Sequence, residues 1–355
     1  QRTGCKVLLA QKAFSNYDCY PLLAPHLAGT EASGLFEARL GAEEMPGKEV
    51  HVFCAAYRAD EMDELVQYAD HIVFNSPAQL AKFGPAAKAA GKSVGLRINP
   101  ECSTQDGHAI YDPCAPGSRL GTTRAQWNAA VAANPALPNL LDGLHFHTLC
   151  EQDSDALATT LDAVAQKFGD LLPRMQWLNF GGGHHITRPG YDIAMLERCT
   201  RAQQDWGVTV YLEPGEACAL NAGFLLSRVL DVVQNGDTTI AILDASAACH
   251  MPDVIEMPYR PPLFAAAEPG EKPCTVRLAG PTCLAGDVIG DYGVDAVPNV
   301  GDLLVFGDMA IYTTCKNNTF NGMPLPAIFA RAASGTTRSI VSFGYEDFKY
   351  RLGKR

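Results

Sequence analysis

Lys12 is the first residue of this 355-residue sequence whose type and position could support covalent chemistry. One residue separates it from the apolar run at 7–10, and it is followed by Ala13 and Phe14. Burial among such neighbours lowers the pKa of an ammonium group and favours a neutral amine that can form a Schiff base with a carbonyl. The alternative is a lysine at a strand end whose ammonium reaches solvent, and the lysine taken alone favours that alternative.

Three consecutive glycines, Gly181, Gly182 and Gly183, follow another apolar run at 177–180. Without side chains, their N–H groups can surround a phosphate. The segment lacks the GxGxxG spacing of a dinucleotide-binding turn, and Pro189 interrupts the helix that such a turn would open. A glycine-rich turn with only a structural role stays open as the alternative.

Glu213, His147 and Cys283 could act on an aromatic cofactor. Glu213 precedes a Pro-Gly pair, and its carboxylate could keep a ring nitrogen protonated. His147 ends an apolar run, where an imidazole could lie flat on a ring. Cys283, in a Pro- and Gly-rich loop, could donate a proton. A solvated loop acid, a core histidine and an inert cysteine are the respective alternatives.

Eight short apolar runs alternate with helical segments over the first 215 residues. The predicted strands are 7–14, 32–40, 50–57, 72–75, 93–98, 143–148, 177–180 and 208–212. The predicted helices are 60–68, 78–90, 124–133, 155–171 and 193–205. This alternation predicts a (β/α)8 TIM barrel, in which reactive groups lie at the C-terminal ends of the strands. A doubly wound sheet is the competing fold, but it would need fewer strands.

A second domain is predicted after residue 220. Helical periodicity ends there, and strand-like runs at 229–234, 240–244, 275–278, 302–306 and 339–343 are separated by Gly, Pro and Asp. We therefore predict a barrel domain at 1–220 and a C-terminal antiparallel β-domain at 221–355.

Composition excludes several classes of function. The net charge of −11 argues against binding to nucleic acid, which requires a basic face. No long apolar run and no signal peptide are present, so we expect a cytoplasmic protein without membrane association. The sequence has no CxxC pair, HExxH motif or Cys/His cluster, and we expect no metal site. The chain starts two residues before a run of strand character, so we expect native sequence to precede Gln1.

The order of these motifs resembles that of the fold-type III pyridoxal 5'-phosphate (PLP) decarboxylases, which include ornithine and diaminopimelate decarboxylases. The resemblance covers the chain from Lys12 to Gly322: a lysine after the first strand, then FH, GGG, EPG, PTC and YTxxxxxTFNG. The strings QKAFS, HFHTLCE, GGGHHIT, EPGEA, PTCLAGD and NNTFNGMPLP together are similar to the carboxynorspermidine decarboxylase branch.

The resemblance implies how PLP would be held. Lys12 would be the Schiff-base lysine, and His147 would stack on the ring. The backbone of Gly181–Gly183 and the hydroxyl of Tyr312 would hold the phosphate. Glu213 would pair with the ring nitrogen.

The resemblance also implies a homodimer with shared active sites, in which Cys283 is donated across the interface as a proton donor. The implied reaction is decarboxylation of carboxynorspermidine, and by extension carboxyspermidine, to norspermidine or spermidine. A cationic substrate of this kind calls for carboxylates, and the candidates are Glu216, Asp287 and Glu151. All three could instead be solvated loop acids.

Two departures from ornithine decarboxylases set the substrate expectation. Glu216 stands where those enzymes have Arg after EPG, and Leu284 stands where they have Asp after PTC. A diaminopimelate or other basic amino-acid decarboxylase is the alternative, although the arginines expected around a distal carboxylate are not evident. A racemase would need a tyrosine base in place of the cysteine. A non-catalytic PLP-binding regulator would be expected to lose the lysine or the cofactor contacts, and both are present.

Overall fold

Eight parallel strands close into a barrel in the computed structural model, which describes residues 2–105 and 111–354. The strands are β1 (Lys6–Ala10), β2 (Gly29–Ala32), β3 (Glu49–Phe53), β4 (His71–Phe74), β5 (Ser93–Arg97), β6 (Gly143–His145), β7 (Trp177–Asn179) and β8 (Thr209–Leu212). Each strand pairs with the next in the chain, and the pairing of Lys6 with Tyr211 joins β1 to β8. The predicted barrel is confirmed.

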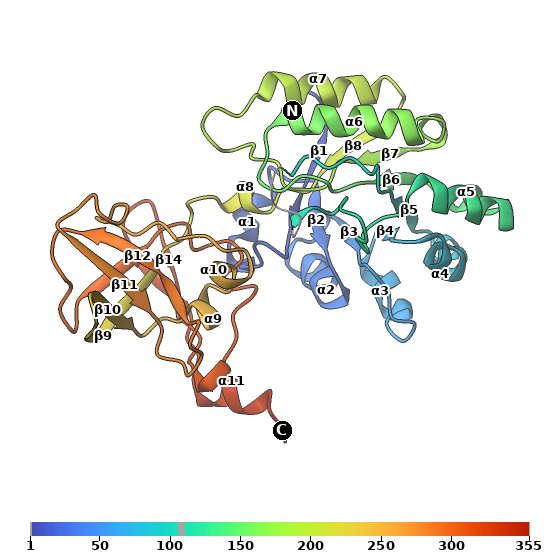
Figure 1. The fold of residues 1–355 in the computed structure, drawn as a ribbon. Helices are drawn as coiled ribbons and strands as arrows, with labels where there is room; N and C mark the ends of the chain where they lie inside the picture. The colour runs from blue at the N-terminus through green and yellow to red at the C-terminus, as the bar shows by residue number, and fades with distance from the viewer. Residues whose placement is uncertain (1, 106–110, 355) are drawn as a thin grey trace. The chain divides into compact units, whose positions relative to one another are not determined.

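Helices surround the strands, as Figure 1 shows for α2 to α7. The α-helices of this part are α1 (Tyr20–Leu23), α2 (Leu35–Glu44), α3 (Met62–Tyr68), α4 (Pro77–Ala89), α5 (Arg124–Ala133), α6 (Ser154–Phe168), α7 (Ile193–Gln204) and α8 (Glu216–Ala219). Short 3-10 helices are η1 (Tyr17–Cys19), η3 (Leu137–Leu140) and η4 (Leu172–Arg174). Local signals fix the helix starts: the side chain of Ser76 caps α4, and Thr123 with Gln126 forms a capping box at α5.

The strand predicted at 32–40 is wrong. Strand β2 ends at Ala32, and residues Leu35–Glu44 form helix α2. The segment LFEARLGAEE consists almost entirely of good helix formers, and Ala38 and Gly41 lie on one buried face. Its apolar residues were therefore read with the wrong period, and the true strand was missed because Gly29–Ala32 is short and contains an acid.

The barrel interior is filled by large aromatic side chains near its N-terminal end. The indole of Trp177 lies over Gly95 and Gly143, where a Cβ would come within 2.3 and 2.0 Å of the ring. Leu8, Val73 and Tyr211 are buried with Trp177 in the same cluster. The two glycines on β5 and β6 are thus required by close packing.

The chain divides into two compact units, Gln1–Lys12 with Cys19–Cys218 and Ala13–Asp18 with Ala219–Arg355. The boundary predicted near residue 220 lies close to Ala219, but the grouping of residues 13–18 with the second unit is not predicted by any sequence pattern. Among residues 2–105 and 111–354, no helix is long and apolar enough to cross a membrane.

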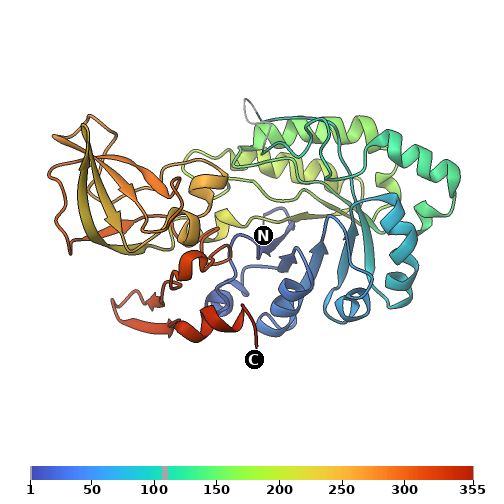
Figure 2. The ribbon, with the colours of Figure 1, turned by 60° about the horizontal axis from the view of Figure 1, so that its bottom comes forward.

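The second unit contains a five-stranded sheet in the order β12-β11-β10-β9-β13. Its strands are β9 (Leu225–Asn235), β10 (Thr238–Leu243), β11 (Cys274–Ala279), β12 (Val288–Val294) and β13 (Leu303–Phe306). A separate hairpin, β14 (Ile328–Arg331) and β15 (Thr337–Val341), leads into α11 (Tyr345–Tyr350) at the red end of the chain in Figure 2. The remaining helices are α9 (Ala247–His250), α10 (Asp253–Glu256) and the 3-10 helix η5 (Phe320–Gly322).

The expectation of a purely antiparallel sheet is corrected at one pair. Strands β10 and β11 run parallel, with Ile240 opposite Arg277. The chain between them, residues 244–273, includes α9 and α10 and returns to the starting end of the sheet, as a parallel crossover requires.

Candidate active site

A cavity of about 210 Å³ lies at the C-terminal ends of the barrel strands. Charged and aromatic side chains from several strands and loops line it: Lys12, Glu31, Ser33, Phe53, Cys54, Ala55, Arg97, Arg119, Leu120, His145, His147 and Glu213. This is the end of a TIM barrel at which catalytic groups converge. Three predicted residues, Lys12, His147 and Glu213, line this one cavity.

Lys12 and Glu31 are neighbours at the mouth of the barrel. Lys12 lies two residues beyond β1 and is half-buried, and Glu31 is paired in register with Ala10 and is 4% exposed. Burial raises the pKa of Glu31 well above its ordinary value, and the charge of Glu213 adds to this effect, while Lys12 and Arg97 oppose it. The Glu31 carboxyl therefore retains its proton to higher pH than an ordinary glutamate.

Glu213 is held at a fixed orientation at the end of β8. One carboxylate oxygen accepts from Nδ2 of Asn179 at 2.6 Å, and the other lies 3.0 Å from Nε2 of His145. Burial by itself raises the pKa of Glu213, but His145 and the Asn179 amide lower it more, and the net shift is downward. Glu213 is therefore a buried carboxylate whose remaining lone pairs can accept from a ring N–H.

His147 is kept neutral beside two cations. Burial lowers the pKa of His147 well below its ordinary value, and the charges of Lys12 and Arg97 lower it further. Its Nδ1 accepts from the N–H of Gly182 at 3.2 Å, which fixes the ring against the glycine turn. Arg97 donates to the His147 carbonyl at 3.1 Å, and its guanidinium lies 4.5 Å from the centre of the Phe53 ring.

The glycine turn packs too closely on its neighbours to allow side chains. A Cβ on Gly181 would lie 2.4 Å from the carbonyl oxygen of Phe146, and one on Gly183 would lie 2.1 Å from that of Leu149. Both glycines also have positive φ, +72° and +80°. Within residues 2–105 and 111–354, the N–H of Gly183 has no hydrogen-bond acceptor, so it is available to an anion.

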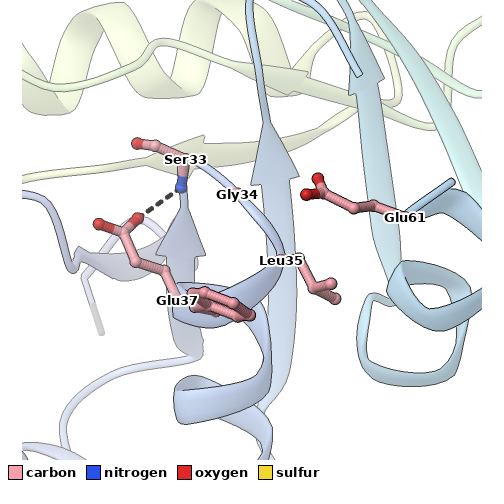
Figure 3. A pocket seen from close by; sticks show the side chains of 6 residues that line it. Ser33, Gly34, Leu35, Glu37 and Glu61 are labelled. Atoms are coloured by element: carbon pink, nitrogen blue, oxygen red, sulfur yellow. Dashed lines mark hydrogen bonds between the residues drawn. The ribbon is translucent and has the colours of Figure 1, made fainter. Parts of the chain in front are cut away.

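A second depression adjoins the cavity, because Ser33 lines both. Figure 3 shows its carboxylates, Glu37 on α2 and Glu61 before α3, on either side of Gly34 and Leu35. The N–H of Ser33 donates to Glu37 at 2.6 Å. Burial raises the pKa of Glu37, and the charge of Lys12 counteracts that shift, so Glu37 is within electrostatic reach of Lys12.

Glu151 and Glu216, two of the predicted substrate carboxylates, lie together in this structure. Nη2 of Arg188 donates to Glu216 at 3.0 Å and to Glu151 at 3.3 Å, and Nε2 of His185 lies 3.3 Å from Glu216. Burial raises the pKa of Glu151, and the charge of Glu216 raises it further. The two carboxylates carry two negative charges, and Arg188 supplies one permanent positive charge. The remaining negative charge could attract a further cation.

The remaining predicted residues, Cys283, Asp287 and Tyr312, belong to the second unit. Cys283 is exposed, and its N–H donates to Oδ1 of Asn321 at 2.8 Å. Asp287 is 3% exposed and accepts from the hydroxyls of Ser246 at 3.0 Å and Thr282 at 2.6 Å. Tyr312 has a positive φ of 48°, and its N–H donates to the carbonyl of Ala13.

The residues present fit PLP. The glycine turn offers to a phosphate the N–H of Gly183, which is unengaged among the described residues, while the N–H groups of Gly181 and Gly182 donate to Asn179 and His147. Lys12 supplies an amine, and Glu213 supplies a fixed carboxylate. His147 contacts the glycine turn through the N–H of Gly182, and the charge of Lys12 lowers its pKa. The fold and this set of donors define a barrel enzyme that uses a PLP-type cofactor.

Comparison with known proteins agrees with this class. The family model described as "Pyridoxal-dependent decarboxylase, C-terminal sheet domain" matches residues 17–310. The chain belongs to the fold-type III PLP-dependent decarboxylases and, among them, to the carboxynorspermidine/carboxyspermidine decarboxylase family.

Relatives with full-length similarity carry two kinds of name. A carboxyaminopropylagmatine decarboxylase of Synechocystis is 44% identical over 99% of this chain and 90% of its own. A carboxynorspermidine/carboxyspermidine decarboxylase of Campylobacter jejuni is 40% identical over 99% and 92%. The crystal structure of carboxynorspermidine decarboxylase from Campylobacter jejuni, complexed with norspermidine, has a TM-score of 0.88 and 39% identity, and covers 99% of this chain and 93% of its own.

The sequence reasoning missed Glu31 and Arg119 as cavity residues. It also assigned no role to Arg97 or His145, which line the same cavity. An acid inside a short apolar strand was the available signal for Glu31, and the misplaced strand at 32–40 hid it. Arg119 comes from a loop with no periodicity, so no sequence signal pointed to it.

Proposed function

We propose that the protein releases CO2 from carboxynorspermidine, and from carboxyspermidine, to give norspermidine or spermidine. That the chain is a decarboxylase of carboxynorspermidine-type polyamine precursors follows from its family. The observation that carries the proposal at the site is the meeting of Lys12, Glu31, His147 and Glu213 around one cavity. Carboxyaminopropylagmatine is the second candidate, because a relative with that name is 44% identical.

The roles follow from the environment of each residue. PLP, when bound, supplies an electron sink for the bond broken on loss of CO2. Lys12 would hold the cofactor aldehyde, and Gly181–Gly183 with the Tyr312 hydroxyl would hold its phosphate. Glu213, with its lowered pKa, would keep the ring nitrogen protonated. Neutral His147 would cover one face of the ring.

Glu216 and Glu151 are proposed to bind the ammonium groups of the substrate tail. Their contacts with Arg188 show that the pair already holds a cationic group. A substrate ammonium could join this cluster and balance its remaining negative charge. Asp287 is a weaker candidate, since Ser246, Thr282 and the N–H of Ala248 engage its carboxylate inside the second unit.

A panel of substrates tests the assignment. We expect CO2 release from both carboxynorspermidine and carboxyspermidine, with kcat/KM values that differ by no more than about 200-fold, because one methylene is worth about 1–3 kcal/mol in a pocket. Ornithine, lysine and diaminopimelate should be turned over far more slowly. In the same assay, Glu216→Gln should raise KM more than it lowers kcat. Faster turnover of carboxyaminopropylagmatine than of both other carboxylated precursors would reassign the substrate.

We propose that the active protein is a homodimer in which Cys283 of one subunit serves the Lys12 site of the other. The exposure of Cys283 leaves its thiol accessible to a partner. Exposed apolar side chains of the same unit, among them Leu226, Leu230 and Leu303, offer surface for association. A thiol in this role would return the proton to carbon after CO2 has left.

Subunit mixing tests the shared site. Lys12→Ala and Cys283→Ala dimers should each be nearly inactive in product formation, but an equal mixture after subunit exchange should regain about a quarter of wild-type activity, since half of the dimers then carry one intact site. Sedimentation should give twice the chain mass. Recovery would be absent if Cys283 acted within its own subunit, and mixing each variant with itself is the control.

A further inference from the structure

A second cluster of metal-ligand residues lies at the N-terminal end of the barrel, away from the strand ends that form the cavity. Glu49 and His51 lie on β3, and His71 lies on β4 directly opposite His51 in the strand register. One ligand atom of each residue lies within 4.8 Å of those of the other two. Lys6 and Tyr211, from β1 and β8, both donate to Glu49, Tyr211 at 2.8 Å. The proposed decarboxylation uses none of these residues.

His51 is buried and His71 is half-buried, and both imidazoles are incompletely hydrogen-bonded. His51 is 1% exposed, and Nδ1 of His51 and Nδ1 of His71 both lack a hydrogen-bond partner among the described residues. Their rings stack with centroids 3.8 Å apart and an interplanar angle of 11°. Two buried ring nitrogens, one on each histidine, thus remain for a further bonding partner.

We propose that Glu49, His51 and His71 form a binding site for a divalent transition metal such as Zn²⁺ or Co²⁺. Zn²⁺ and Co²⁺ bind a donor set of imidazole nitrogen and carboxylate oxygen more readily than Mg²⁺ or Ca²⁺ does. Nε2 of His51 lies 3.0 Å from Oε2 of Glu49. That spacing is close to the roughly 3.3 Å between two ligand atoms that each lie about 2.0 Å from one tetrahedral ion.

Two local changes accompany metal binding. The nitrogen lone pairs of the two stacked rings lie in nearly parallel planes, so one imidazole must rotate about its side-chain torsions for both rings to face one ion. The ammonium of Lys6, which now contacts Glu49, competes with the dication for the carboxylate. Its side chain is 41% exposed and can move to solvent. Lys6 is therefore expected to weaken metal binding.

Trp177 provides an internal reporter. Its ring centroid lies 5.3 Å from that of His71 and 6.5 Å from that of His51. Rotation of an imidazole, or a bound Co²⁺ ion, changes the surroundings of the indole directly. Tryptophan fluorescence and the visible absorption of Co²⁺ thus report on the site without any measurement of decarboxylation.

Titration of the untagged holoenzyme with Zn²⁺ or Co²⁺ tests the proposal. We expect one site per chain by calorimetry, visible bands of Co²⁺ with nitrogen ligands, and a change in Trp177 fluorescence. His71→Ala should lower the affinity by at least about tenfold. Lys6→Met, which removes the competing ammonium and retains the ligands, should raise it. The fluorescence change should be lost in Trp177→Phe.

A second acidic and histidine set, Glu151, His185 and Glu216, provides the matched control. The affinity for metal at Glu49, His51 and His71 should be unaffected by Glu216→Gln. The proposal is overturned if the metal affinity falls in Glu216→Gln but survives in His71→Ala, or if the wild type and Lys6→Met both fail to bind at millimolar metal. Because Lys6→Met leaves all three ligands in place, it decides the question even if His71→Ala does not fold.

Discussion

Lys12→Ala is expected to release no measurable CO2 and to lose the visible absorbance of bound PLP. The amine at the barrel mouth is the group proposed to join the cofactor, and among the residues that line the cavity it is the only lysine. Loss of a covalent catalyst costs on the order of 10⁴-fold or more in kcat. Absorbance spectra of the purified protein and CO2 release from carboxynorspermidine measure the two effects.

Lys12→Arg separates covalent from electrostatic roles. Arginine keeps the positive charge beside Glu31 but does not form the bond at neutral pH. Lys12→Arg should therefore be as inactive as Lys12→Ala, although it retains the charge balance of the cavity. Lys82→Ala, which alters an exposed helix residue, should behave like the wild type. Substantial activity in Lys12→Arg would contradict the covalent role.

Glu213→Gln should lower kcat by about 10²- to 10⁴-fold while the protein still binds PLP. A glutamine can accept from the ring nitrogen but carries no charge to keep it protonated. The amide also cannot accept from both His145 and Asn179, as the carboxylate does. Glu213→Asp should recover part of the activity, because it restores the charge at a shorter reach. Steady-state or stopped-flow rates would measure the loss of kcat, and titration with PLP would show whether cofactor binding is retained.

The lowered pKa of Glu213 also predicts how the free energy of unfolding changes with pH. A carboxyl with a folded-state pKa below the unfolded value of about 4.3 stabilises the fold above that pH, and this contribution is lost as the pH falls through the folded-state pKa. The difference in unfolding free energy between the wild type and Glu213→Gln should therefore shrink below pH 4.3. If the difference grew on acidification, the pKa of Glu213 would be raised in the folded protein.

The barrel could be predicted because its signals are local. Short apolar runs bounded by turns located seven of the eight strands, and helical periodicity located α3 to α7 to within a few residues. The exception shows the limit of that reasoning. Residues 35–44 have apolar positions compatible with either period, and the close approach of Gly41 in this helix to Thr30 on β2 is a tertiary contact that the sequence pattern does not reveal.

The site was less completely predictable than the fold. Lys12, His147 and Glu213 follow strands and could be recognised by position, because parallel strands deliver their ends to one edge. Glu31 was hidden by the misplaced strand. The hydrogen bonds that Asp287 accepts from Ser246 and Thr282 join residues 41 and 5 positions apart in the chain, and sequence spacing does not predict them.

The parallel pairing of β10 with β11 could not be predicted either, because it also depends on how distant parts of the chain are arranged. Strand signals at 240–244 and 275–278 were correct in place, but direction is set by the path of the connecting chain. That path includes α9 and α10, each only four residues long. Helices of one turn leave almost no periodicity in the sequence.

Borohydride reduction of the holoenzyme followed by peptide mass spectrometry would identify the lysine that is bonded to the cofactor. We expect the peptide containing Lys12 to gain the mass of a phosphopyridoxyl group, and no other lysine to do so. A phosphopyridoxyl group on a different lysine, or an unmodified Lys12 in protein that still releases CO2, would contradict the assignment of the active site.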